Sequence, residues 1–134
     1  MQIQILLLLR ELQKTLGMAM ILVTHDLGVA CETADHVAVM YAGRIVETAN
    51  IGELMQAPQH PYTIGLLGAT VGGLSRKDVL KAIPGSPPDL SDLPLGCSFA
   101  PRCSHAMDRC KTETLTQVQR TSRHTVLCHL SGAS

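Results

Sequence analysis

Residues 18–48 of the chain read MAMILVTHDLGVACETADHVAVMYAGRIVET. Residues 18–24 form a short, continuous apolar run between a glycine and polar residues, which predicts a buried strand of the parallel type. Residues 36–41 predict a second buried strand, and residues 44–48 alternate like the return strand of a hairpin. Asp26 is placed to cap a short helix between the two strands. The stretch therefore predicts an α/β fold.

Helices are expected on both sides of this stretch. Residues 1–16 carry Leu and Ile at helical spacing. Downstream, Asn50 is expected to begin a helix that Pro58 ends, and Pro61 to begin another. The chain then changes character, because residues 73–134 are rich in Pro, Ser, Thr and Cys and form no continuous periodic pattern. Within this tail the sequence predicts a helical patch at residues 75–82, an extended proline-rich segment at 83–94 and a small strand at 124–130.

Composition excludes some classes of function. The chain has 134 residues, with 11 Lys+Arg against 11 Asp+Glu. Without a basic surplus, a nucleic-acid partner is not expected. Aromatic residues make up 2% of the chain, which also disfavours stacking platforms for bases or sugars.

His25 is the first candidate site residue. It directly follows the carboxyl end of the predicted strand at residues 18–24, where open α/β sheets bind ligands. A histidine there can donate a hydrogen bond to a phosphate oxygen or orient a water molecule. An ordinary strand-to-helix turn capped by Asp26 is the alternative, and spacing alone favours it.

Four cysteines in the tail form the second candidate site. Cys97, Cys103, Cys110 and Cys128 have the spacing C-x5-C-x6-C-x17-C. Thiolates that converge from a loop-rich segment bind soft metals or iron–sulfur clusters. The spacing matches neither zinc knuckles nor the common ferredoxin patterns. Zinc, a cluster and metal-free thiols therefore all stay open.

Several other residues could bind a ligand, although a solvated or structural role is favoured for each. Three histidines could replace a cysteine ligand, but solvated surface positions are favoured: His105, His124 and His129. Arg102 could hold a sulfide or a backbone carbonyl, and solvation is again the favoured alternative. Cys31 is expected to be a buried or half-buried thiol, and His36 and His60 to be structural.

Residues 21–47, ILVTHDLGVACETADHVAVMYAGRIVE, strongly resemble the end of the ATP-binding subunit of an ABC transporter. In that resemblance His25 matches the switch histidine, which contacts the ATP γ-phosphate and positions the attacking water. The segments HPYTIGLL, IPGSPPDL and LPLGCSFAPRC resemble the C-terminal extension of the oligopeptide/dipeptide importer ATPases, parts of which the nickel importers share. The wording GCSFAPRCSHAM resembles the D-type of the two paired subunits.

The resemblance implies a fold and its division. It implies the C-terminal part of a P-loop (RecA-like) ABC ATPase core followed by a small, loop-rich extension that contains the cysteines. Residues 1–56 would end the core, residues 57–72 would form connecting helices, and residues 73–134 would form the extension. ATP and Mg²⁺ are the cofactors implied for the intact subunit. A 4Fe-4S cluster on Cys97, Cys103, Cys110 and Cys128 is implied by some relatives, with zinc as the alternative.

The implied function is energy coupling in an importer for oligopeptides or dipeptides. The implied partners are a second ATPase subunit, membrane permease subunits and, indirectly, a peptide-binding protein. The expected location is the cytoplasmic face of the cell membrane, since no segment reads as a signal peptide or a membrane span.

Several ATPase motifs are missing from the sequence. It contains no G-x-x-x-x-G-K-S/T loop, Q-loop, LSGGQ signature or Walker B segment. We therefore expect an N-terminally truncated fragment that is inactive alone. The alternative is a non-catalytic iron–sulfur or zinc-binding module.

Overall fold

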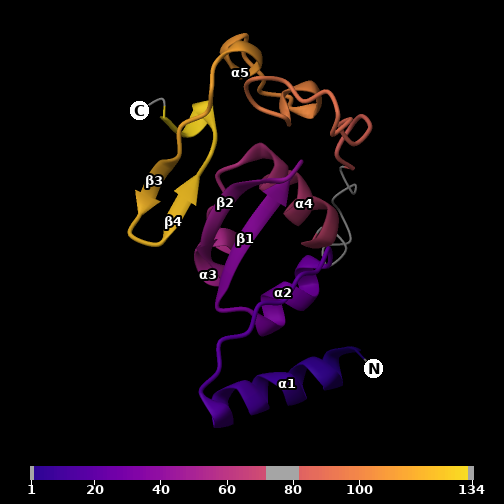
Figure 1. The fold of residues 1–134 in the computed structure, drawn as a ribbon, viewed down its shortest axis with the longest axis vertical. Helices are drawn as coiled ribbons and strands as arrows, with labels where there is room; N and C mark the ends of the chain where they lie inside the picture. Colours follow the sequence, from indigo (N-terminus) through magenta and orange to yellow (C-terminus); the bar gives the residue numbers. More distant parts are fainter. Residues whose placement is uncertain (1, 72–81, 133–134) are drawn as a thin grey trace. The chain divides into compact units, whose positions relative to one another are not determined.

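The computed structural model describes residues 2–71 and 82–132. The chain divides into two compact units, Met1–Asp35 and His36–Ser134 (Figure 1). This division differs from the sequence-based one at 1–56, 57–72 and 73–134, which stays a prediction. The described fold is α/β with an antiparallel sheet.

The first unit contains α1 (Gln2–Leu16) and α2 (Leu27–Thr33). Gly17 ends α1 in the left-handed region, with φ +64°, and the Met18 N–H donates to the Gln13 carbonyl oxygen at 3.1 Å. This closure is typical of a glycine just past a helix end. Arg10 connects the two helices, because its guanidinium donates to the Glu32 carbonyl oxygen at 2.8 Å.

The strand predicted at residues 18–24 is wrong. The structure assigns these residues no strand, and the side chains of Ile21 and Val23 are each 92% exposed. A parallel strand forms only when neighbouring strands accept and donate its backbone hydrogen bonds. The described part of the first unit offers no such neighbour, so the apolar run stays an exposed, unpaired segment.

The second unit begins with a hairpin of β1 (His36–Tyr41) and β2 (Arg44–Asn50). Ala42 and Gly43 both have positive φ, +49° and +77°. This is the backbone of a type I′ turn, which matches the twist of a tight hairpin. α3 (Ile51–Gln56) and α4 (Pro61–Val71) follow, so the predicted hairpin and both helix starts are confirmed.

A second hairpin, β3 (Val118–Thr121) and β4 (His124–Val126), extends the sheet. β4 pairs antiparallel with β2, so the described strands are ordered β1-β2-β4-β3. Figure 1 shows the two hairpins side by side. The tail is therefore joined to the first hairpin by backbone pairing.

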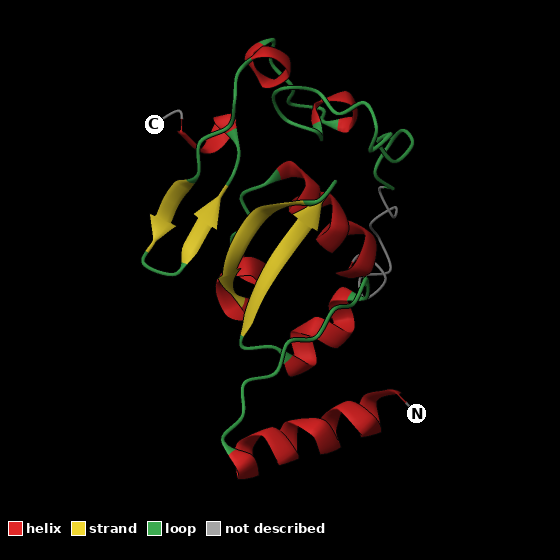
Figure 2. Cartoon of the chain, in the orientation of Figure 1, coloured by secondary structure: helices red, strands yellow, loops and turns green. Residues whose placement is uncertain are grey.

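The long connection between α4 and β3 is mostly loop in its described part (Figure 2). It contains only the 3₁₀ turn η2 (Ala100–Arg102) and α5 (Arg109–Thr112) within residues 82–117. A last 3₁₀ turn, η3 (His129–Gly132), follows β4. Most of the helical patch predicted at residues 75–82 lies outside the described residues. Among the described helices, none is long and apolar enough to cross a membrane.

The core of the second unit collects the chain's few aromatic side chains. The sequence has two Tyr, one Phe and no Trp. Tyr41 lies 4.6 Å from Tyr62 and 5.2 Å from Phe99 between ring centroids. Tyr62 and Phe99 are 5.4 Å apart. These edge and tilted contacts, which are favourable for aromatic pairs, fasten the cysteine-containing loop to the sheet and to α4.

Candidate functional site

His25 lies in a capped turn between the exposed apolar run and α2. The Asp26 carboxylate accepts hydrogen bonds from the Gly28 and Val29 N–H groups, at 2.8 and 3.3 Å. The Asp26 N–H in turn donates to Thr24 Oγ1 at 3.0 Å. The predicted cap is therefore confirmed, and the turn presents the His25 side chain to solvent.

Cys31 lies on α2 and is half-buried, as expected. Burial raises the pKa of its thiol, and the nearby Asp26 and Glu32 carboxylates raise it further. A thiol with a raised pKa is a poor nucleophile at neutral pH, which fits a structural role.

The four tail cysteines converge on one small cavity of about 10 Å³. They come from separate parts of the tail, because Cys97 and Cys103 flank η2, Cys110 lies in α5, and Cys128 follows β4. None of the four is in a disulfide. The fold therefore brings four thiols that are far apart in sequence to the same cavity.

Gly96 allows two segments of the cysteine loop to approach each other closely. The Cys97 N–H donates to the Cys110 carbonyl oxygen at 2.6 Å. A Cβ on Gly96 would lie 2.3 Å from that same oxygen and 2.8 Å from the Glu113 carbonyl oxygen. Only glycine fits this close backbone approach, which sets the separation of Cys97 from Cys110.

Burial dominates the electrostatics of these thiols. It raises the pKa of Cys97, Cys103 and Cys128, although backbone N–H groups that point at each sulfur lower the pKa in part. Backbone N–H groups also stabilise thiolates in metal and cluster sites. The surroundings of Cys97, Cys103 and Cys128 therefore disfavour thiolates on balance, while the backbone N–H groups there would stabilise thiolates bound to a cation.

Within the described residues, no group of three or more His, Cys, Asp or Glu side chains is arranged to hold a metal ion. The four cysteines line one cavity, but their side chains are not drawn together into a metal-binding group in this structure.

Arg102 is a positioning residue, and the solvated side chain favoured from sequence is wrong. Its Nε donates to the Pro84 carbonyl oxygen at 2.8 Å. Weaker contacts reach the carbonyl oxygens of Ile83 and Gly85, both at 3.4 Å. The guanidinium therefore holds the proline-rich segment against the cysteine loop, which is the backbone-carbonyl alternative.

Glu47 is a buried carboxylate that sequence reasoning missed. It is 1% exposed, and its two oxygens accept three hydrogen bonds. The Gln59 N–H donates at 2.8 Å, the His60 N–H at 2.9 Å and His124 Nε2 at 2.7 Å. A carboxylate only accepts, so His124 carries its proton on Nε2. Glu47 thereby joins β2, β4 and the start of α4.

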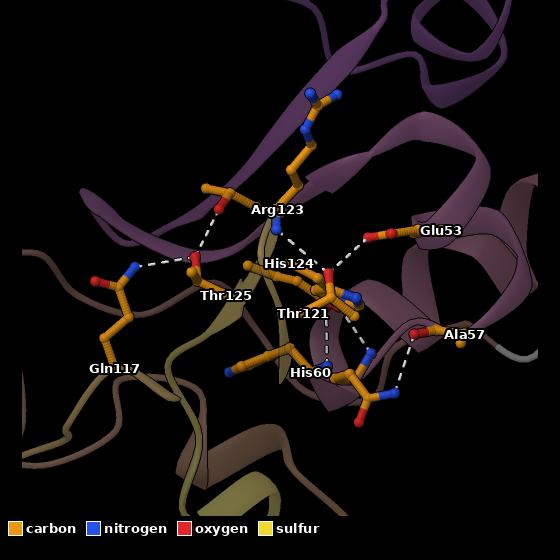
Figure 3. Close-up of polar contacts among 11 residues, drawn as sticks. Glu53, Ala57, His60, Gln117, Thr121, Arg123, His124 and Thr125 are labelled. Atoms are coloured by element: carbon orange, nitrogen blue, oxygen red, sulfur yellow. Dashed lines mark hydrogen bonds and ion pairs between the residues drawn. The ribbon is translucent and has the colours of Figure 1, made fainter. Parts of the chain in front are cut away.

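His124 is 3% exposed, so its assignment to the solvated surface is wrong. The reason is the pairing of β4 with β2, which places the ring beside Glu47. Figure 3 shows His124 with its neighbours Thr121 and Thr125, and the contact between Thr121 and Glu53 that links β3 to α3. The hairpin is held to the rest of the unit by side chains as well as backbone.

His60 caps α4 from within the core. Its Nδ1 accepts a hydrogen bond from the Tyr62 N–H at 3.0 Å, which is the role of an N-cap side chain. Its Nε2 is buried and has no hydrogen-bond partner among the described residues. Burial lowers the pKa of His60 to about 4, against the opposing effect of Glu47. The ring also lines the cysteine cavity. His60 therefore contributes to the candidate site in addition to the structural role expected from the sequence.

The other two histidines predicted near the cysteines also line the cavity. His105 is exposed, and His129 is half-buried with an Nε2 that has no hydrogen-bond partner among the described residues. His36 is exposed on β1 and is not among the residues that line the cavity.

Comparison with known proteins shows which sequences this chain is similar to. Residues 46–110 match the family model described as "Oligopeptide/dipeptide transporter, C-terminal region". The dipeptide transport ATP-binding protein DppD of Bacillus subtilis is 45% identical over 133 residues, covering 96% of this chain and 38% of that protein. The oligopeptide transport ATP-binding protein OppD of the same organism is 53% identical over 108 residues, covering 79% and 30%.

A third relative comes from a different genus. The dipeptide transport ATP-binding protein DppD of Caldanaerobacter subterraneus is 43% identical over 129 residues, covering 96% of this chain and 40% of that protein. The chain thus spans between 30% and 40% of the length of these relatives. Over most of its length the chain matches the C-terminal region of oligopeptide/dipeptide transport ATP-binding proteins.

Proposed function

We propose that the chain acts as the C-terminal region of an ATP-binding subunit that powers import of oligopeptides or dipeptides. The observation that carries this proposal is the match of 96% of the chain to a dipeptide transport ATP-binding protein. His25 would be the switch histidine, and the capped turn that exposes it supports this role. These 134 residues contain no P-loop motif, so His25 is the one ATP-contacting residue proposed in them.

This function requires partners. A second ATPase subunit would complete the nucleotide sites, permease subunits would carry the peptide across the membrane, and a peptide-binding protein would deliver it. The subunit would work at the cytoplasmic face of the membrane. The exposed apolar run at residues 18–24 would pair with strands of the ATPase core, where the sequence pattern of a buried strand applies.

Substitution of His25 in a working ATPase tests this role. The matching C-terminal region of Bacillus subtilis DppD would be replaced by this chain, which aligns over 133 residues. The chimera is expected to hydrolyse ATP, and His25→Ala to lower its rate about a hundredfold or more, because one group that orients the attacking water is lost. ATP turnover of the purified chimeras is the measurement.

His36→Ala is the matched control, since His36 is also exposed and lies on β1. It should leave turnover unchanged. Equal turnover in the His25→Ala chimera and the unsubstituted chimera would exclude the switch role.

We also propose that Cys97, Cys103, Cys110 and Cys128 hold a 4Fe-4S cluster, with zinc as the alternative. Their convergence on one cavity and their soft sulfur donors support a thiolate-bound group. Such a group would stabilise the loop-rich tail and could carry one electron.

Metal content and colour distinguish the two groups. The 134-residue chain, purified without oxygen, is expected to be brown, with visible absorbance that is lost on reduction and chelation. Cys110→Ser should remove this absorbance, whereas Cys31→Ser, outside the cavity, should retain it. A colourless chain with stoichiometric zinc would establish the alternative, and a chain without metal would exclude both.

A further inference from the structure

One ring nitrogen of His60 forms a hydrogen bond, and the other has no hydrogen-bond partner among the described residues. Nδ1 accepts the hydrogen bond of the Tyr62 N–H, so the neutral ring carries its proton on Nε2. That N–H is buried, and no described residue accepts from it. A buried donor without a partner destabilises a fold, and the side chain as a whole is only 1% exposed. The arrangement therefore needs an acceptor that the described residues do not supply.

The contacts around His60 indicate where that acceptor would lie. The nearest carboxylate, Glu47, already accepts from the backbone N–H of His60, from Gln59 and from His124. The His60 ring packs beside Phe99, with centroids 5.9 Å apart. Both rings line the same cavity as the four cysteines. The space that the thiols border is thus also bordered by the ring with the unused donor.

We propose that His60 Nε2–H donates a hydrogen bond to a sulfur atom of the group bound by Cys97, Cys103, Cys110 and Cys128. The inference rests on the proposed thiolate-bound group in this cavity. Sulfur accepts hydrogen bonds, and in cluster proteins such bonds raise the reduction potential by stabilising the more negative, reduced form. His60 would then act at both ring nitrogens, capping α4 through Nδ1 and contacting the bound group through Nε2.

His60→Asn separates these two roles. Asparagine is a preferred N-cap residue, so its side chain can keep the hydrogen bond to the Tyr62 N–H while the donor toward the cavity is lost. The full chain would be purified without oxygen as wild type, His60→Asn and the control His36→Asn. Iron content, the midpoint potential of the cluster and the rate of iron release to a chelator are measured for each.

The His60→Asn chain is expected to keep its iron, to show a lower midpoint potential and to release iron roughly fivefold faster, as for the loss of one hydrogen bond. His36→Asn should match wild type. If His60→Asn retains iron with unchanged potential and release rate, the inference about His60 is wrong while the cofactor proposal stands. A wild-type chain that binds no metal would overturn both proposals.

A measurement on the wild type covers the case in which the variant does not fold. In the chain labelled with ¹⁵N-histidine, pulsed electron paramagnetic resonance of the reduced cluster should detect coupling to a histidine nitrogen. The double variant His105→Asn/His129→Asn identifies the source, because both of these histidines also line the cavity. Coupling that persists in the double variant supports His60. Absent coupling, or coupling lost in that variant, contradicts the inference.

Discussion

Glu47→Ala is expected to lower the free energy of unfolding of the chain by about 3–5 kcal/mol, the range for breaking a buried ion pair or charged hydrogen-bond network. The substitution removes the acceptor of three buried or part-buried donors, from Gln59, His60 and His124. Each donor then loses its partner while remaining away from water. Because Glu47 joins β2, β4 and the start of α4, we expect the β3–β4 hairpin to lose its protection in amide hydrogen exchange as well.

Glu53→Ala is the matched control for this prediction. Glu53 is a glutamate on the adjoining helix α3, and it accepts one exposed hydrogen bond from Thr121 Oγ1 at 3.2 Å. Its loss should cost less than about 1 kcal/mol. Denaturant unfolding followed by circular dichroism measures both variants. Equal destabilisation by the two substitutions would show that Glu47 does not organise the unit.

Gly96→Ala is expected to disrupt the cysteine loop. The new methyl group would lie 2.3 Å from the Cys110 carbonyl oxygen and 2.8 Å from that of Glu113. Both are backbone atoms, so neither can rotate away as a side chain would. We expect a loss of stability of about 3 kcal/mol, at the upper end of overpacking effects, together with loss of any metal bound by the cysteines.

Gly68→Ala provides the opposite control. Gly68 lies within α4, and a Cβ there meets nothing within 4 Å. Replacement of a helical glycine by alanine should stabilise the chain by about 0.5–1 kcal/mol. Thermal unfolding and metal content are measured for both variants. If Gly96→Ala melts and binds metal like the wild type, the close approach of Cys97 and Cys110 does not shape the site.

Local signals in the sequence predicted the local structures. The Ala42-Gly43 turn, the Asp26 cap and the proline at the start of α4 each depend on a few adjacent residues, and all three are present. The strand predicted at residues 18–24 failed because a strand depends on neighbours. The apolar pattern of residues 18–24 indicates that this segment could pair within a buried sheet. It does not show whether the described unit contains a neighbouring strand.

Glu47 shows what local patterns could not reveal. Simple alternation places Val46 and Glu47 on opposite faces of β2, but a bulge opposite Val39 and Met40 shifts the register. Both residues are consequently buried. The partner His124 is 77 residues away along the chain, and only the pairing of β2 with β4 brings it close. The strand RIVETAN contains other polar residues, so the sequence carried no local signal that singled out Glu47.

For the cysteine site, the sequence indicated the cysteines but not the residues around them. Four cysteines in a loop-rich tail indicated a common site, and the fold brings them to one cavity. The place of His60 there depends on α4, which is distant in sequence but packs on Phe99 through Tyr62. The scarcity of aromatic residues was informative about ligands that stack, but it did not predict that Tyr41, Tyr62 and Phe99 would gather in one core.

Dipeptide uptake tests the central claim most directly. Bacillus subtilis cells would carry DppD with its matching C-terminal region replaced by this chain, and uptake of a labelled dipeptide would be measured. We predict uptake well above that of cells without DppD, and its loss in the His25→Ala chimera at equal protein level. Uptake no higher than in cells without DppD, from a chimera that folds and is present at the normal level, would contradict the account.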